Sequence, residues 1–458
     1  YFRQGAAAAA AAPGIMIHSM QRDRERRLRR KPRRKRGLVA CLMALTGVAL
    51  LGNLLTSPHL EAAADADGRP PGYRPPVEAA SRVMATLPPA ESSDARAAAA
   101  ALSIVEALPP APRIAYAVTV TEEPKASSVG FLDGAAVLAQ SVLKAHQRSS
   151  YGAPAFVAFV SPRISRKTRS SLRGIGFRSI EKQLPISPEK IEGSFLRKLW
   201  TEPNEKFPDP TLRGGCCGAW ELLKLYAWTL TEYERVVHVD MDCLLLHPID
   251  ELLSIDASLV YTADYNMMND NQRKNKLTPA VQGGFLVVRP SLDVFQALVA
   301  LMQRGKWGGK CSGWECTGVG HWWGGATIQG LLPYFYDRHA KTLSLKRASD
   351  LKAVEVDRCI YDNMGDKAVT NPLPYVGCSA ARQTPFDEVK FAHFTVCQKP
   401  WTCNPARDPD DALKICLKLH AAWFDLRRDF EAEHGMPSEK KVCRRGYQKM
   451  AFPAGFGE

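Results

Sequence analysis

Short apolar segments alternate with segments of helical spacing between residues 114 and 303. The apolar segments are rich in β-branched and aromatic residues, as buried strands are, and the longer segments repeat apolar residues every three to four positions. This alternation predicts an α/β fold, with a mainly parallel sheet covered by helices on both faces. The predicted strands are residues 114–121, 155–160, 177–180, 235–240, 258–262 and 284–288, and the predicted helices are residues 131–146, 164–174, 219–231 and 291–303.

The composition agrees with a folded domain of this kind, because 45% of the 458 residues are hydrophobic and 24% are charged. The net charge is +14, but residues 22–36 alone contribute +9 and the other 443 residues carry +5. Nucleic-acid-binding domains usually carry a basic face on the folded part, so we expect no nucleic-acid partner. A nuclear localisation signal within the basic run is an alternative.

An uncharged apolar run, residues 38–55, follows the basic one. As a helix it would be about 27 Å long, which is close to the hydrocarbon thickness of a thin bilayer. Because the basic flank predicts a cytoplasmic N-terminal side, we expect a signal-anchor helix of a single-pass type II membrane protein, with residues 1–37 as a cytoplasmic tail. A cleaved signal peptide and a buried helix are the alternatives.

The remaining segments divide by composition. Residues 56–112 are rich in Ala and Pro and predict a low-complexity stem. The folded domain should then span residues 113–405, with residues 406–458 as a C-terminal extension. The segment 305–323 is rich in Gly, Trp and Cys and predicts a loop near the site that disulfides could hold.

Eleven of the twelve cysteines lie beyond the apolar run. In a secretory lumen several of them should form disulfides, and an odd number leaves at least one thiol unpaired or intermolecular. We expect Cys216 and Cys217 to form disulfides rather than bind a metal, because no further Cys/His pair has zinc-site spacing.

Two carboxylates end the strand predicted over residues 235–240, in Asp240-Met-Asp242. Ligands of such sheets bind beyond the carboxyl ends of the strands. Carboxylate oxygens suit Mg²⁺ or Mn²⁺, and such an ion can stabilise a departing diphosphate. Asp-x-Asp also occurs in ordinary turns, so the pair alone does not identify a site. His238 lies inside the same strand, and we expect it in the core.

Four segments, in one order along the chain, carry a more specific pattern. They are residues 224–253 around the two aspartates, residues 282–291 (Gln-Gly-Gly-Phe-Leu-Val-Val-Arg-Pro-Ser), Gly324-Gly325 with residues 329–332 (Gln-Gly-Leu-Leu), and residues 393–401 (His-Phe-Thr-Val-Cys-Gln-Lys-Pro-Trp). Together they resemble glycogenin and its relatives in glycosyltransferase family 8, over about residues 114–401. The resemblance implies a GT-A type, Rossmann-like nucleotide-sugar-binding domain.

The resemblance also implies the site residues. Asp240, Asp242 and His393 would bind Mn²⁺, with Mg²⁺ as the alternative, since imidazole suits Mn²⁺ better. Asp264 and Gln329 would be catalytic residues near the sugar. Those that would bind the UDP-sugar are Thr119, Thr121, Lys224, Gln282, Gly283 and Lys399. For Thr119 and Thr121, strand packing is the alternative.

Two departures from the family pattern concern the mechanism. Ile328 stands where the family has an Asp before Gln329, so the resemblance does not predict which sugar the donor carries. Val396 replaces the Gly that follows the His-Phe pair in the family, so we expect the diphosphate loop to differ in shape. The family retains the anomeric configuration, and we expect retention here by attack on the same face rather than through a carboxylate adduct.

The expected function is a metal-dependent retaining glycosyltransferase in the lumen of the Golgi or another secretory compartment. It would transfer a hexose or glucuronate from a UDP-sugar to a glycan, glycolipid or protein acceptor. A non-catalytic family member that binds nucleotide sugar or glycan is the alternative. The membrane is the further expected partner, through residues 38–55, and a homodimer stays open.

Overall fold

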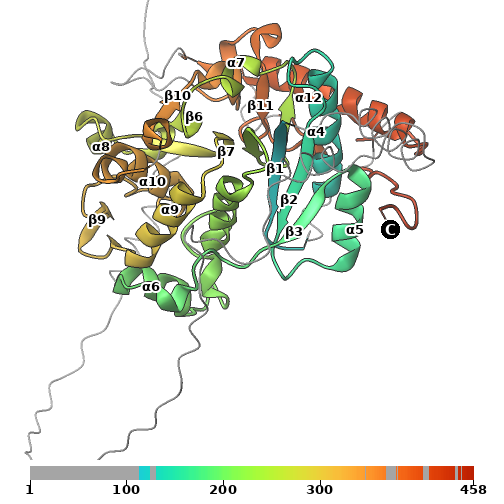
Figure 1. The fold of residues 1–458 in the computed structure, drawn as a ribbon. Coiled ribbons are helices and arrows are strands. Elements are labelled where there is room, and N and C mark those ends of the chain that lie inside the picture. The colour runs from blue at the N-terminus through green and yellow to red at the C-terminus, as the bar shows by residue number, and fades with distance from the viewer. Residues whose placement is uncertain are drawn as a thin grey trace, which may run out of the picture. The chain divides into compact units, whose positions relative to one another are not determined.

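The computed structural model describes residues 113–123, 130–345, 347–367, 378, 380–405, 412–438, 442–444 and 446–457 (Figure 1). The predicted tail, apolar run and stem, residues 1–112, lie outside these ranges. Among the described residues, no helix combines the length and the apolar character that crossing a membrane requires.

A seven-stranded sheet forms the centre of the described part. Its strand order is β10-β6-β7-β4-β1-β2-β3, and β7 runs antiparallel to both neighbours while every other pair is parallel. The prediction of a mainly parallel sheet is therefore confirmed. The strands are β1 (Ile114–Val120), β2 (Ala155–Val160), β3 (Arg178–Glu181), β4 (Arg235–Val239), β6 (Leu259–Asp264), β7 (Ala280–Val288) and β10 (Ala353–Glu355).

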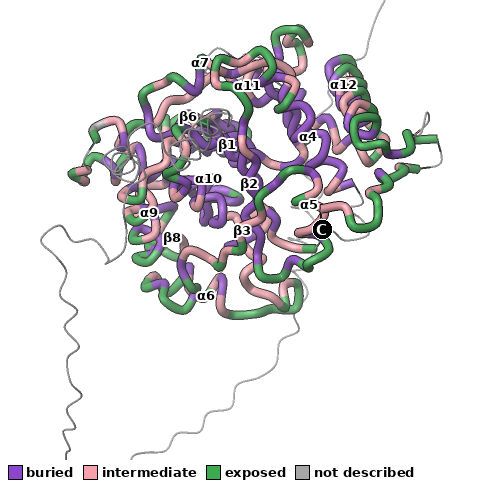
Figure 2. Tube along the Cα trace, turned by 45° about the vertical axis from the view of Figure 1, so that its right-hand side comes forward, coloured by how far each residue is buried: buried purple, intermediate pink, exposed green. Residues whose placement is uncertain are grey.

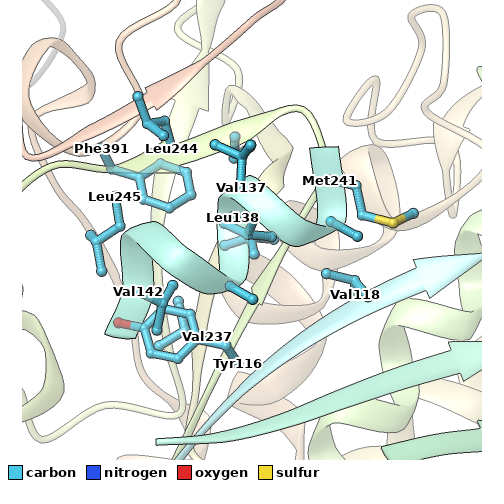
Figure 3. Close-up of a cluster of buried hydrophobic side chains, with 14 of the residues drawn as sticks. Tyr116, Val118, Val137, Leu138, Val142, Val237, Met241, Leu244, Leu245 and Phe391 are labelled. Carbon is cyan, nitrogen blue, oxygen red and sulfur yellow. The ribbon is translucent and has the colours of Figure 1, made fainter. Parts of the chain in front are cut away.

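Helices cover both faces of the sheet, because successive side chains of a strand point to opposite faces. In β1, Tyr116 and Val118 belong to one buried cluster, whereas Ala115 and Ala117 belong to the other. Figure 3 shows Tyr116 and Val118 with side chains of the first cluster around them. That face carries α4 (Phe131–His146), α5 (Arg166–Ile175) and α12 (Ala412–Glu433), and the other carries α6 (Ser194–Thr201), η4 (Gly218–Thr229), α9 (Leu292–Arg304) and α10 (Ile328–Tyr334).

Both clusters consist mainly of buried strand and helix residues. Figure 2 shows purple segments in the interior and green ones mostly around the outside. Burying one aliphatic or aromatic side chain contributes roughly 1.5–3 kcal/mol, so the two clusters together hold the layers in place.

The shorter elements connect these layers. The short strands are β5 (Cys243–Leu245) with β11 (Phe391–His393), and β8 (Trp307–Gly308) with β9 (Cys311–Trp314). The short α-helices are α7 (Asp250–Leu253), α8 (Asp270–Lys274) and α11 (Arg358–Tyr361). The other short helical turns are η2 (Pro188–Lys190), η3 (Pro210–Leu212), η5 (Tyr265–Met267), η6 (Phe335–His339), η7 (Ala340–Thr342), η8 (Ala348–Leu351), η9 (Ala381–Gln383), η10 (Phe386–Glu388) and η11 (Pro400–Thr402).

Side-chain caps and glycines set the first and last residues of two predicted helices. The Ser165 side chain accepts a hydrogen bond from the Thr168 amide at the start of α5, and Gly176 ends that helix with a φ of 114°. Ser291 caps α9 in the same way, and Gly305 ends it with a φ of 55°. A left-handed residue after a helix is strongly favoured to be glycine, which explains both stops.

The segment predicted as an α-helix over residues 219–231 is instead a 3₁₀ helix, η4. It is buried on nearly all sides, so packing rather than local propensity sets its geometry. In a 3₁₀ helix residues three apart lie above one another, and this brings Glu221 Oε2 to 2.9 Å from Lys224 Nζ.

Four disulfides join cysteines of the described part: Cys311–Cys316, Cys359–Cys378, Cys397–Cys416 and Cys403–Cys443. The first closes the segment 305–323, as predicted. The expected disulfides of Cys216 and Cys217 are wrong, because both are free thiols, as is Cys243. The other eight cysteines beyond the apolar run are already paired, and Cys243 is buried with its Sγ 3.7 Å from the Gly284 carbonyl oxygen.

The segment after residue 405 packs against the sheet-covering helix α4. Gln140 Nε2 donates to Glu433 Oε1 over 2.7 Å, and the buried Arg427 guanidinium lies 3.7 Å from Asp133. The disulfides at Cys397 and Cys403 add covalent links to this segment. Residues 412–457 therefore contribute to the core beneath α4.

Candidate active site

The carboxyl ends of β1, β4 and β6 meet at one edge of the sheet, and β7 begins there because it runs the opposite way. Ligands of α/β sheets bind at such an edge. The predicted site residues that lie on or next to these strand ends are Thr119, Thr121, Asp240, Asp264, Gln282 and Gly283.

A small second ladder brings His393 to this edge. Asp242 lies between β4 and β5, and β5 pairs antiparallel with β11 so that His393 is opposite Cys243. The Phe394 amide also donates to the Asp242 carbonyl oxygen over 2.9 Å. As a result, His393 Nε2 lies 3.5 Å from Asp242 Oδ2, although the two residues are 151 positions apart in the chain.

Gly284 makes room for the imidazole. A Cβ atom at this position would overlap the His393 ring. The Gly284 carbonyl oxygen accepts a hydrogen bond of 3.2 Å from the Asp240 amide, so the same residue lies next to both predicted ligands. The resemblance named Gln282 and Gly283 but not Gly284, whose role depends on a contact with a distant segment.

Asp240 is held by a buried lysine. Lys224 Nζ lies 2.9 Å from Asp240 Oδ1 and 2.9 Å from Glu221 Oε2, and it donates to the Gly283 carbonyl oxygen over 3.0 Å. Burial raises the pKa of Asp240, but Lys224 and then His393 outweigh it and lower that pKa to about 2. Asp240 is thus ionised at neutral pH. The predicted donor-binding Lys224 contacts these protein groups, and it positions Asp240.

Asp362 is a site residue that the sequence did not reveal. It is fully buried, its Oδ1 lies 3.3 Å from His393 Nδ1, and Thr262 Oγ1 donates to its Oδ2 over 2.9 Å. The neighbouring Asn363 pairs with β11, since the His393 amide donates to its carbonyl oxygen over 3.0 Å. This pairing of residues 30 positions apart has no signal in the sequence. A carboxylate on the second ring nitrogen orients a metal-binding histidine.

Lys399 is the second lysine of the site, and its ammonium forms an ion pair with Asp242. Trp401 docks the segment that carries Lys399, because its side chain fills the space left by Gly130, the N-cap residue of α4, and by Gly134 within α4. A Cβ at Gly134 would also lie 2.6 Å from the Met241 carbonyl oxygen, between the two aspartates. The two glycines therefore let α4, the turn at residues 240–242 and the segment that carries Lys399 approach one another closely.

Asp264 lies in a buried polar cluster beside Gln282. Arg358 Nη1 is 3.4 Å from Asp264 Oδ1, and Gln282 Nε2 is 3.4 Å from Asp264 Oδ2. Arg358 Nη2 is also 2.9 Å from Asp366 Oδ2, where burial raises the pKa of Asp366. Asp264 is therefore a carboxylate matched by a guanidinium rather than an isolated nucleophile.

The other predicted residues lie near this cluster or pack in the strands. A Cβ at Gly283 would lie 3.6 Å from Gln329 Cγ, and Gln329 also contacts the Gly324 backbone. Thr119 Oγ1 lies 2.8 Å from Nε2 of the fully buried His238, which confirms that His238 is in the core. Thr121 accepts a hydrogen bond from Ser161 on its carbonyl oxygen over 2.7 Å.

The donor set suits a hard divalent cation such as Mn²⁺. Ligand atoms of Asp242, Cys243 and His393 lie within 4.8 Å of one another. Burial lowers the pKa of His393, but Asp362 and Asp240 outweigh it and raise that pKa, so the surrounding field favours positive charge. Lys399 shows the same preference by placing its ammonium on Asp242. Two carboxylates and one imidazole are ligands that Mn²⁺ accepts.

A cavity of about 760 Å³ lies elsewhere, at the opposite edge of the sheet. Its lining includes Arg235, which begins β4, and Arg289, which follows β7. It shares no residue with the site around Asp240.

Comparisons with known proteins return distant structures only. No family model matches the chain, and no curated protein matches it either. Three of the similar solved structures are glycosyltransferases. Bifunctional WbbM has a TM-score of 0.41 and 11% identity, over 71% of this chain and 52% of that chain. LgtC with donor and acceptor sugar analogues has a TM-score of 0.35 and 13% identity, over 72% of this chain and 98% of that chain, and mouse xyloside xylosyltransferase 1 has a TM-score of 0.36 and 10% identity, over 61% of this chain and 96% of that chain. The chain thus spans about half the length of WbbM.

Proposed function

We propose that this chain is a metal-dependent glycosyltransferase with a GT-A type domain that uses a UDP-sugar. The observation that carries the proposal is that His393 Nε2 lies 3.5 Å from Asp242 Oδ2 at the carboxyl edge of the sheet. Asp240 directly follows β4 at the same edge, and His393 lowers its pKa. The family resemblance names all three residues independently. Their donor atoms suit Mn²⁺, with Mg²⁺ as the alternative. A bound ion would supply charge stabilisation for the departing diphosphate.

The chain's own residues would bind the other parts of the donor and position the metal ligands. Lys399 would release Asp242 and turn its ammonium to the diphosphate, where it acts as a mobile point charge. Lys224 would hold Asp240 in place through their ion pair. Gln282, Asp264 and Gln329 would bind hydroxyl groups of a hexose or glucuronate, while Thr119 and Thr121 would line the nucleoside side.

Retention by attack on the same face fits this arrangement better than a carboxylate adduct does. Ile328, which replaces the family's Asp, is fully buried among apolar side chains. Asp264, the carboxylate that the resemblance placed near the sugar, is buried and paired with Arg358. Neither residue offers a free nucleophile to an anomeric carbon.

The acceptor would be a glycan, glycolipid or protein in the lumen of the Golgi or another secretory compartment. Four disulfides support an oxidising compartment, where such bonds persist. The predicted anchor over residues 38–55 and the type II orientation belong to the same proposal.

The test is donor turnover by the full chain across a panel of UDP-sugars, with Mn²⁺ and with a chelator. Turnover should require the ion and should fall by at least about a hundredfold in Asp242→Ala, the loss typical of removing charge stabilisation at the reacting centre. Asp425→Ala is the matched control, because Asp425 is exposed on α12 and pairs only with Arg428 in the described part. Full activity in Asp242→Ala would refute the metal role.

A non-catalytic sugar-binding protein is the second candidate, and the replacement of the family's Asp by Ile328 favours it. Calorimetry that finds Mn²⁺-dependent binding of a UDP-sugar, together with no turnover on any acceptor, would select this candidate.

A further inference from the structure

Cys216, Cys217 and Glu221 form a second cluster of ligand atoms beside the candidate active site. Their two sulfurs and a carboxylate oxygen lie within 4.8 Å of one another, and both cysteines are free thiols. We propose that this cluster is a binding site for one soft divalent cation, Zn²⁺ or Cd²⁺. A search for Cys/His spacing misses it, because the third ligand is a glutamate on the following helix.

The backbone holds the three groups in place before any ion arrives. Gly214 and Gly218 flank the two cysteines with φ values of 94° and 59°, which favour glycine. A Cβ at Gly218 would overlap the Thr211 carbonyl oxygen, so the turn is closely packed. Cys217 is the N-cap residue of η4, and Glu221 lies in the first turn of that helix. A preformed arrangement of this kind lowers the cost of binding.

The ligand types select a soft cation over Mn²⁺. Thiolates prefer Zn²⁺ and related ions, and four-coordinate zinc would take the two sulfurs, the carboxylate and one water. Binding displaces the two thiol protons to solvent, so charge and atoms balance.

The cluster is separate from the candidate manganese site but connected to it. A Cβ at Gly215, the residue before Cys216, would lie 3.5 Å from Gly324 Cα, so the cluster packs next to the segment that carries Gln329. Glu221 is also the partner of Lys224, which holds Asp240. A cation that draws the Glu221 carboxylate away from Lys224 leaves the ammonium to pair with Asp240 alone. This stronger pairing competes with a metal ion at Asp240 and should weaken Mn²⁺ binding there by several-fold. This coupling rests on the proposed function, whereas binding of the soft cation does not.

The direct test is a Cd²⁺ titration of the reduced full chain, followed by the ultraviolet absorption of cadmium–thiolate bonds. We expect one thiolate-bound Cd²⁺ per chain, and at least about tenfold weaker binding in Cys216→Ser, Cys217→Ser and Glu221→Gln, the loss typical of damage to a metal site. Glu202→Gln is the control, because Glu202 is an exposed carboxylate at the end of α6, and it should keep the signal. Circular dichroism checks that each variant is folded.

Two results would overturn the proposal. One is a thiolate signal that is absent, or unchanged in all three variants. The other is a Cys216–Cys217 disulfide, found by mass spectrometry in protein isolated without reductant, because it would remove both sulfur ligands. Loss of cadmium binding in Cys216→Ser would support the site even if Asp242→Ala showed no effect on turnover, so the two proposals fail separately.

Discussion

Replacing Lys224 with Met tests the buried ion triad that holds Asp240. The lysine side chain is 6% exposed and the Glu221 side chain 12%, so little water screens this pair, whereas Asp240 is 34% exposed. Methionine has a similar volume but no charge. The variant would therefore leave two carboxylates beside each other with no counterion, without opening a large cavity.

The expected cost follows from the distances. At an effective dielectric constant of about 20, unit charges separated by the 2.9 Å of each contact attract by about 6 kcal/mol. Much of this gain offsets the desolvation of the ammonium, and removing one partner of a buried pair typically costs about 3–5 kcal/mol. Because Asp240 is partly exposed, we expect the lower end, about 3 kcal/mol in the free energy of unfolding.

Urea unfolding of both proteins in chelator measures this loss. Lys198→Met is the matched control, since Lys198 is exposed and lies 4.0 Å from Glu202, so its loss should change stability by less than about 0.5 kcal/mol. Adding Glu221→Gln to Lys224→Met should recover part of the stability, because it removes one uncompensated charge. A Lys224→Met protein as stable as the wild type would refute the ionic triad.

Two further perturbations test other contacts. Burial lowers the pKa of His420 below its unfolded value, so the unfolded chain binds the proton first and stability should fall as the pH drops below about 6.5. Urea unfolding at pH 7.5 and 5.5 should show that the free energy of unfolding falls less in His420→Gln than in the wild type, by up to about 1.4 kcal/mol per pH unit. An equal fall in the two proteins would contradict this. Gly284→Ala should push the His393 ring aside and weaken Mn²⁺ binding by at least about tenfold in calorimetry, whereas unchanged affinity would contradict the close packing.

Much of the fold could be predicted because strong periodicity reports burial. The segments 131–146 and 155–160 match α4 and β2, where apolar residues repeat with the helical or strand period. Short elements were missed, among them the edge strand β10 and the β5–β11 ladder, because three residues carry no period. The 3₁₀ geometry of η4 was also missed, since surrounding helices and strands impose it.

The site shows the same division. Asp240, Asp242, His393 and Lys399 could be named because ordered motifs surround them, and the structure brings Asp242 together with His393 and Lys399 and couples Asp240 electrostatically to His393. Asp362 could not be predicted, because it reaches His393 through a pairing between segments that are distant in sequence. Glu221 could not be predicted either, because its contact with Lys224 depends on an unexpected helix type. Four local sequence patterns therefore predict the residues of the candidate site, and tertiary contacts add the groups that support them.

The most direct measurement is the anomalous scattering of manganese in crystals grown with Mn²⁺ and UDP. One manganese peak should lie among the carboxylates of Asp240 and Asp242 and Nε2 of His393, with the Lys399 ammonium moved from Asp242 towards the diphosphate. A crystal in which the peak lies away from these three side chains, or in which UDP binds elsewhere and Lys399 stays on Asp242, would contradict the proposed active site.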